Sequence, residues 1–145
     1  MSRQQRWINA APALLLCVLI GLAGCGKKDW PSPQAENDRF TWAEVNGTWQ
    51  NDCLIIQAGL QGAYWNLASL RLEIETLPEP CPGCPFQPTR SVDLPMSAPN
   101  VTQDKGQLQI TYCNLEGTGF TRWRLVGHNR YRQIQDTLTG VSILE

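Results

Sequence analysis

The chain lacks the residue patterns on which familiar catalytic sites depend. It has a single histidine, His128, and contains no G-x-S-x-G, H-E-x-x-H or phosphate-binding loop motif. A lone histidine without an identifiable partner is more often a surface or strand-end residue than a general base. These absences favour a protein that is not an enzyme, and the sequence predicts neither a cofactor nor a metal site.

An excess of positive charge is also lacking. The chain has 12 lysines and arginines against 13 acidic residues, a formal net charge of −1. Proteins that bind nucleic acid carry a strongly basic patch, so no nucleic-acid partner is expected. The apolar fraction is ordinary, which disfavours disorder along the whole chain.

Long apolar runs are absent except at the N-terminus. There, Arg3 and Arg6 precede an apolar segment at residues 10–22, which is the order of parts in a secretory signal peptide. A membrane-spanning helix needs roughly 20 apolar residues, more than this segment holds. An uncleaved transmembrane anchor is therefore the less favoured alternative.

The residues that close this run, Leu22-Ala23-Gly24-Cys25, resemble a bacterial lipobox. The resemblance implies that residues 1–24 are cleaved and that Cys25 becomes the lipidated first residue of a protein anchored to the membrane of the bacterial cell envelope. In enteric-type bacteria an aspartate after the lipobox cysteine would favour the inner membrane, so the resemblance, with Gly26 at that position, implies the outer membrane. The 121 residues that remain carry a formal charge of −3 and suffice for one domain.

Residues 25–38 are polar, contain two prolines and show no hydrophobic period, which is typical of a semi-extended tether. Residues 39–145 are expected to form the folded domain. Within it, Asn46-Gly47 predicts a hairpin turn after a strand that begins at Phe40. At residues 70–75 three aliphatic side chains alternate with three charged ones, which predicts a strand with one packed and one solvated face.

Further strand patterns recur along the domain, whereas the segment at residues 77–88 holds five prolines and excludes both helix and central strand. The sequence therefore predicts an all-β fold, a sandwich of about seven strands with a small barrel as the alternative. The strand patterns lie at residues 53–58, 90–94, 108–112, 120–126 and 139–144.

Two short stretches resemble known all-β families. The run EGTGFTRWRLVGHN resembles the E–F corner and F strand of fibronectin type III domains, with Gly117, Thr118 and Phe120 at the corner. This resemblance implies an immunoglobulin-like sandwich. Gly47-Thr48-Trp49 is similar to the G-x-W of lipocalin-like barrels, which would imply a barrel around a small apolar ligand.

Four cysteines fall in the domain: Cys53, Cys81, Cys84 and Cys113. An even set in an exported domain predicts disulfides, and four cysteines allow three pairings. The C-P-G-C spacing at residues 81–84 is that of thiol–disulfide motifs, but the surrounding prolines disfavour the helix on which thioredoxin-like chemistry depends. Structural disulfides are therefore favoured, and a periplasmic thiol–disulfide protein is the alternative.

Arg122, Trp123 and Arg124 are the candidate binding residues, because arginine pairs well with carboxylates and phosphates. Glu73 and Glu75 are expected to answer the two arginines from a neighbouring strand, and Trp123 is expected to pack in the core. The sequence as a whole predicts a non-catalytic binding or scaffolding module with an envelope protein or a glycan as its partner. A peptidoglycan- or polysaccharide-binding module is the alternative.

Overall fold

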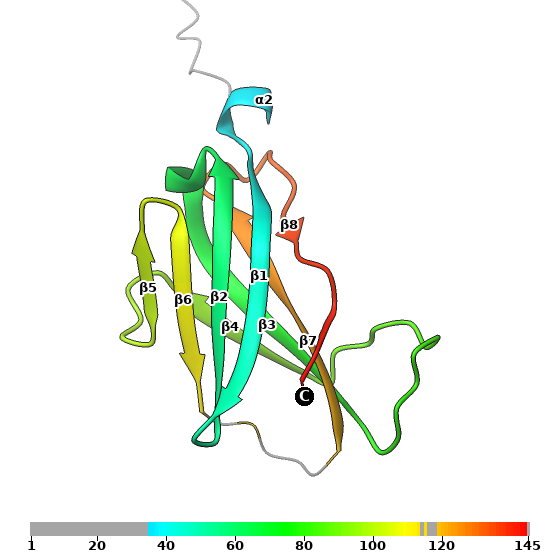
Figure 1. Ribbon diagram of the computed structural model, residues 1–145. Helices are drawn as coiled ribbons and strands as arrows, with labels where there is room; N and C mark the ends of the chain where they lie inside the picture. The colour runs from blue at the N-terminus through cyan, green and yellow to red at the C-terminus, as the bar shows by residue number, and fades with distance from the viewer. Residues whose placement is uncertain (1–34, 114, 116–118, 145) are drawn as a thin grey trace, which may run out of the picture. The chain divides into compact units, whose positions relative to one another are not determined.

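The computed structural model describes residues 35–113, 115 and 119–144 (Figure 1). The predicted signal peptide, the predicted lipidation site Cys25, and Gly117 and Thr118 of the stretch that resembles fibronectin type III domains lie outside these residues. Among the residues that the structure describes, no helix is long and apolar enough to cross a lipid bilayer.

Two antiparallel sheets form the domain. The first contains β1 (Phe40–Gln50), β2 (Cys53–Gly62), β5 (Val101–Asp104) and β6 (Gln107–Tyr112). The second contains β3 (Leu67–Leu77), β4 (Arg90–Pro95), β7 (Phe120–Asn129), β8 (Thr137–Leu138) and β9 (Ser142–Ile143). One helical turn, α2 (Ala35–Asp38), precedes β1, and the 3-10 turn η1 (Tyr64–Asn66) joins β2 to β3.

The strand order confirms the predicted all-β sandwich. The sheets run β1-β2-β6-β5 and β4-β3-β7-β8, with β9 also paired to β7. Immunoglobulin-like sandwiches place strands A, B, E and D in one sheet and C, F and G in the other, and the present order follows that scheme with β4 added beside β3. The two sheets are not joined into a barrel. The strand number exceeds the predicted seven because β5 and β8 carry too few residues to show a pattern, whereas β9 falls within the strand predicted at residues 139–144.

The hairpin turn predicted at Asn46-Gly47 is wrong. β1 continues through both residues, and the chain reverses instead at Asn51 and Asp52, whose φ angles are positive (51° and 61°). Gly47 faces the interior, where a Cβ atom would overlap Cζ2 of Trp123. The glycine is therefore required by the close approach of the indole and not by a turn.

Trp123 occupies the centre of the core and is fully buried. Its indole N–H has no hydrogen-bond partner among the described residues. The side chains packed around it alternate along strands of both sheets, as a sandwich core requires. The fully buried members are Phe40, Leu54, Ile56, Leu70, Leu72, Ile74, Ile110 and Leu125.

One disulfide closes the first sheet. Leu54 on β2 pairs with Tyr112 on β6, so Cys53 and Cys113 lie at the next position along the two strands and are bonded to each other. The bridge spans 60 residues of sequence. In the chain-entropy model such a bridge stabilises the fold by about 4 kcal/mol. It lies within one sheet, unlike the inter-sheet bridge of antibody domains.

Replacing Gly47 tests the packing of the core. Gly47→Ala is expected to lower the free energy of unfolding by about 1–3 kcal/mol, because the new methyl group overlaps the Trp123 indole. Urea unfolding followed by fluorescence measures the change. Gly140→Ala is the control, since a Cβ there meets no atom within 4 Å. Equal effects of the two substitutions would contradict the packing described here.

Candidate functional site

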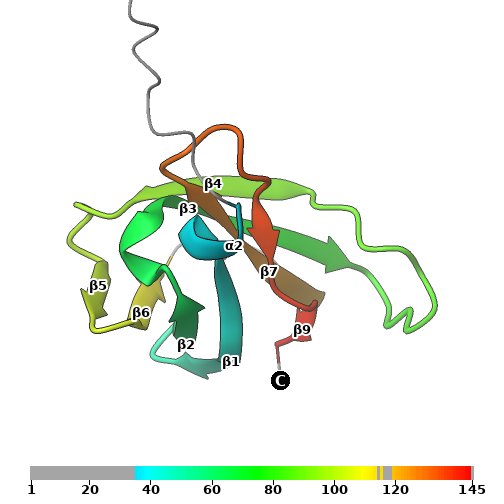
Figure 2. The ribbon, with the colours of Figure 1, turned by 90° about the horizontal axis from the view of Figure 1, so that it is seen from above.

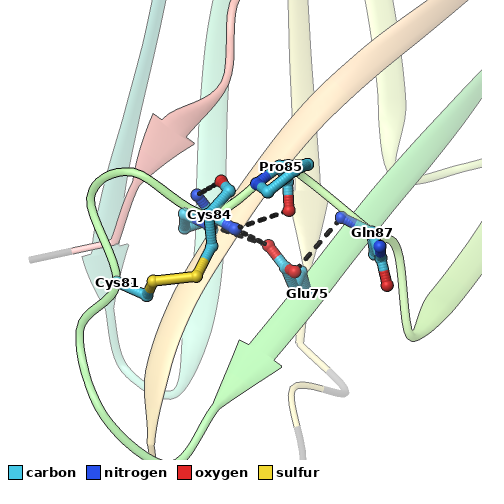
Figure 3. Close-up of a disulfide and its surroundings, with 6 residues drawn as sticks. Glu75, Cys81, Cys84, Pro85 and Gln87 are labelled. Carbon is cyan, nitrogen blue, oxygen red and sulfur yellow. Dashed lines mark hydrogen bonds and ion pairs between the residues drawn. A yellow bond between two sulfur atoms is a disulfide. The ribbon is translucent and has the colours of Figure 1, made fainter.

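The proline-rich segment at residues 78–89 leaves the end of β3 and projects beyond the two sheets before it returns to β4 (Figures 1 and 2). The prediction that it is neither helix nor strand is confirmed. At its tip the amide of Cys84 donates to the carbonyl of Cys81 at 3.2 Å, and a disulfide joins the two side chains (Figure 3). We call this segment the CPGC loop.

Arg122 holds the CPGC loop on the sheet. It stands opposite Glu75 in the β3–β7 register, and its Nε donates to Glu75 Oε2 at 2.7 Å. The two remaining guanidinium nitrogens reach the loop backbone, Nη1 at 3.0 Å from the carbonyl of Cys84 and Nη2 at 3.3 Å from that of Pro85. A single side chain thus joins the second sheet to the tip of the loop.

Glu75 completes the attachment from the other strand. Its Oε1 accepts a hydrogen bond from the amide of Gln87 at 3.1 Å (Figure 3). Farther along, the amide of Thr89 donates to the carbonyl of Ile74 at 2.9 Å. The side chains of Arg122 and Glu75 are only 7% and 4% exposed. The prediction of a solvated face along residues 70–75 is therefore wrong at Glu75, because the loop covers that end of the strand.

A second ion pair lies beside the first. Arg124 Nε is 2.6 Å from Glu73 Oε2, and both groups are partly buried. The ring of Phe86, carried by the CPGC loop, lies 4.8 Å from the Arg124 guanidinium and 5.9 Å from that of Arg122. These are cation–π distances. The expected pairing of the two arginines with the glutamates of the neighbouring strand is confirmed. The sequence did not predict that Phe86, the one aromatic residue of the loop, contacts both arginines.

A third ion pair, between Arg71 on β3 and Asp93 on β4, is exposed. Arg71 Nε lies 2.8 Å from Asp93 Oδ1, and no loop covers these side chains. The hydrogen bond and the charge of Arg71 lower the pKa of the Asp93 carboxyl, and the same contact raises the pKa of Arg71. Because the aspartate pKa is lowered in the folded state, this pair contributes stability above the ordinary aspartate pKa and loses it as the pH falls.

The structure does not gather the three predicted binding residues on one surface. Trp123 points into the core, as its alternation with the arginines predicted. Arg122 and Arg124 point to the opposite side, where each is engaged with a glutamate and covered in part by the CPGC loop. His128 lies farther along the same strand, and its Nδ1 is 3.0 Å from Asp136.

The surroundings of Cys81 and Cys84 lack the feature that thioredoxin-like chemistry uses. After Cys84 the chain continues as irregular backbone into β4, so no helix N-terminus stands at this pair. Such a terminus is what stabilises the reactive thiolate in that class of protein. Within the described ranges, no three His, Cys, Asp or Glu side chains gather as a metal ion would require.

The outward face of the first sheet carries uncharged polar side chains that the sequence reasoning did not single out. Its centre is a row that crosses all four strands, in which Asn46 pairs with Gln57, Gln57 with Gln109, and Gln109 with Thr102. At the usual strand spacing this row is about 14 Å long. We call this surface the amide face.

The amide face is hollowed at two adjoining places, with volumes of about 340 and 410 Å³. Gln57 and Gln107 border both hollows, and Gly59 leaves room in the second because it has no side chain. Neither hollow is lined by lysine or arginine, and each has one acidic residue at its border, Asp104 in the first and Glu44 in the second. The surface offers amide groups that both donate and accept hydrogen bonds.

Replacing Glu75 tests the attachment of the CPGC loop. Glu75→Gln is expected to cost about 3–5 kcal/mol of folding stability, because it leaves the buried Arg122 without its counter-charge. Denaturant unfolding measures the change. Asp93→Asn makes the same chemical change in the exposed pair and should lower the stability far less than Glu75→Gln does. A small effect at Glu75 would show that the ion pair does not hold the loop.

Comparisons with known proteins give no information on function, so the function has to be inferred from the structure. No family model, no curated protein and no solved structure matches this chain. The likenesses to fibronectin type III domains and to lipocalin-like barrels therefore stay at the level of short sequence stretches. What the chain does has to be argued from the CPGC loop, the amide face and the end of the domain at which the described chain begins.

Proposed function

We propose that the protein is a lipid-anchored, non-catalytic binding module of the bacterial cell envelope, and that the CPGC loop contacts its partner. The observation that carries this proposal is the position of the loop. Arg122 holds it on the sheet at the end of the sandwich opposite α2, and α2 is where the described chain begins (Figure 1).

The length of β7 gives the distance between the end of the sandwich at α2 and the end that carries the CPGC loop. The carbonyl of Asp38, at the end of α2, accepts hydrogen bonds from the side chains of Asn66 and Asn129. Arg122 precedes Asn129 by seven residues on the same strand, which places the attachment of the loop about 23 Å from that end. The CPGC loop is therefore attached at the opposite end of the domain from α2, where the described chain begins.

The loop is both exposed and fixed in conformation, as a binding loop often is. Most of its residues are exposed, including Glu79 and Gly83, whereas the contacts that fix it lie underneath. A loop held in one conformation loses little entropy when it binds, so its contacts contribute more fully to affinity. We expect the partner to be an envelope protein whose surface is complementary in shape to the loop.

The lipid anchor is testable without knowing the partner. Intact mass measurement of protein taken from its native membrane should show a diacylglyceryl adduct on Cys25 and loss of residues 1–24. Cys25→Ser should move the protein from the membrane fraction to the soluble fraction. A wild-type protein with an unmodified N-terminus would refute the anchor.

The contact through the loop is tested by photo-crosslinking in cells. A photoreactive residue at Gly83 should give one discrete cross-linked product, and combining it with Glu75→Gln should reduce the yield because the loop is loosened. The control position is Leu138, which is also exposed but belongs to β8. Absence of a product at Gly83, or the same product from Leu138, would contradict the role of the loop.

The amide face supports a second candidate function, the binding of a polysaccharide such as the glycan of peptidoglycan through its uncharged sugar groups. Sugar hydroxyls donate and accept hydrogen bonds, and the side chains of Gln57 and Gln109 do the same. The hollows lack basic side chains, which fits an uncharged ligand better than an anionic one.

This second function has its own test. The double substitution Gln57→Ala and Gln109→Ala removes the centre of the row and should abolish retention on purified cell-wall polysaccharide in a sedimentation assay. Arg71→Ala, on the other sheet, is the control and should be retained like the wild type. Unchanged retention of the double variant would exclude the amide face as the site.

A further inference from the structure

Trp65 is held outward at one end of the sandwich. Its side chain is 59% exposed, the largest value among the exposed large apolar residues of the described chain. The indole packs edge-on against Tyr64, with ring centroids 5.2 Å apart. Tyr64 in turn packs over the β5–β6 turn, where a Cβ on Gly106 would lie 3.4 Å from its ring. The indole is thus supported from behind and directed toward solvent.

This end of the sandwich is the one at which the described chain begins, and Figure 2 views the molecule from it. The carbonyl of Trp65 accepts a hydrogen bond from Arg130 at 3.3 Å. The next residue, Asn66, donates its side-chain N–H to the carbonyl of Asp38 in α2 at 3.1 Å. Trp65 therefore lies beside α2, at the end of the domain where the described chain begins.

The chain between Cys25 and Ala35 is short, with nine residues separating the two. Fully extended, this segment spans about 35 Å. β7, with ten residues, is about 33 Å long. A lipid on Cys25 would therefore keep the end that carries Trp65 within roughly one domain length of the bilayer surface.

The chemistry of this end fits the interface of a lipid bilayer. Tryptophan is enriched at membrane–water interfaces because its indole combines an apolar body with a polar N–H group. Arg130 and Arg132 are exposed nearby, and arginine pairs well with phosphate. Glu36 and Asp136 lie on the same end, so the contact depends on the indole more than on net charge.

We infer that this end of the sandwich rests on the bilayer that holds the lipid anchor, and that the Trp65 indole enters its headgroup region. The inference rests on the proposed anchor at Cys25. It assigns an orientation as well as a contact, because the CPGC loop then points away from the membrane.

The experiment uses the full lipidated protein reconstituted into vesicles of phosphatidylethanolamine and phosphatidylglycerol. One set of vesicles carries bromine on the acyl chains near the headgroup, where it quenches the fluorescence of indoles in contact with it. The wild type should show bromine-dependent quenching, and Trp65→Phe should lose the share that Trp65 contributes. Trp30, which lies between Cys25 and the described residues, remains in every variant and sets the background.

Trp49→Phe is the matched control, because Trp49 is also exposed, at 37%, but lies at the far end of β1. It should leave the quenching unchanged. Quenching that is equal in the wild type and in Trp65→Phe would overturn the orientation. Flotation of the vesicles separates this failure from failure of the anchor, since a wild type that floats no better than Cys25→Ser would overturn the proposed function itself.

Discussion

The buried ion pair between Arg122 and Glu75 is the interaction on which the candidate site depends. Removing two charges from water is costly, and the cost is offset only when both groups are fully hydrogen-bonded. Here the carboxylate accepts from Arg122 and from the amide of Gln87, and the guanidinium donates to Glu75 and to the carbonyls of Cys84 and Pro85. The partners that satisfy these charges come from the CPGC loop, so burying the pair and docking the loop are one event.

β7 links the docking of the CPGC loop to the packing of the core. Trp123, between the two arginines, points the other way and fills the space that Gly47 leaves in β1. Because side chains alternate along a strand, a shift of β7 by one residue would expose the indole and bury both arginines without partners. The packing of one large side chain thus fixes the register in which Arg122 meets Glu75.

Much of the fold was predictable from local patterns, and the site was predictable only in part. Alternation at residues 70–75 and 120–126 placed two strands and the pairing of glutamates with arginines. The burial of Glu75 was not predictable, because it results from packing against a segment ten residues away whose proline-rich sequence carries no period. The turn predicted at Asn46-Gly47 was wrong because glycine occurs both in turns and where a side chain approaches the backbone closely. The sequence alone does not distinguish these two cases. The sequence allowed three disulfide pairings. The pairing is settled by the β2–β6 register, which places Cys53 beside Cys113.

The sheet beneath the CPGC loop holds it in one conformation. Backbone order parameters from ¹⁵N relaxation test this most directly, because they report the amplitude of motion residue by residue. At residues 83, 84 and 87 we expect order parameters close to the roughly 0.85 of rigid backbone, like those of β3 and β7. Values below about 0.6 across the loop would contradict it.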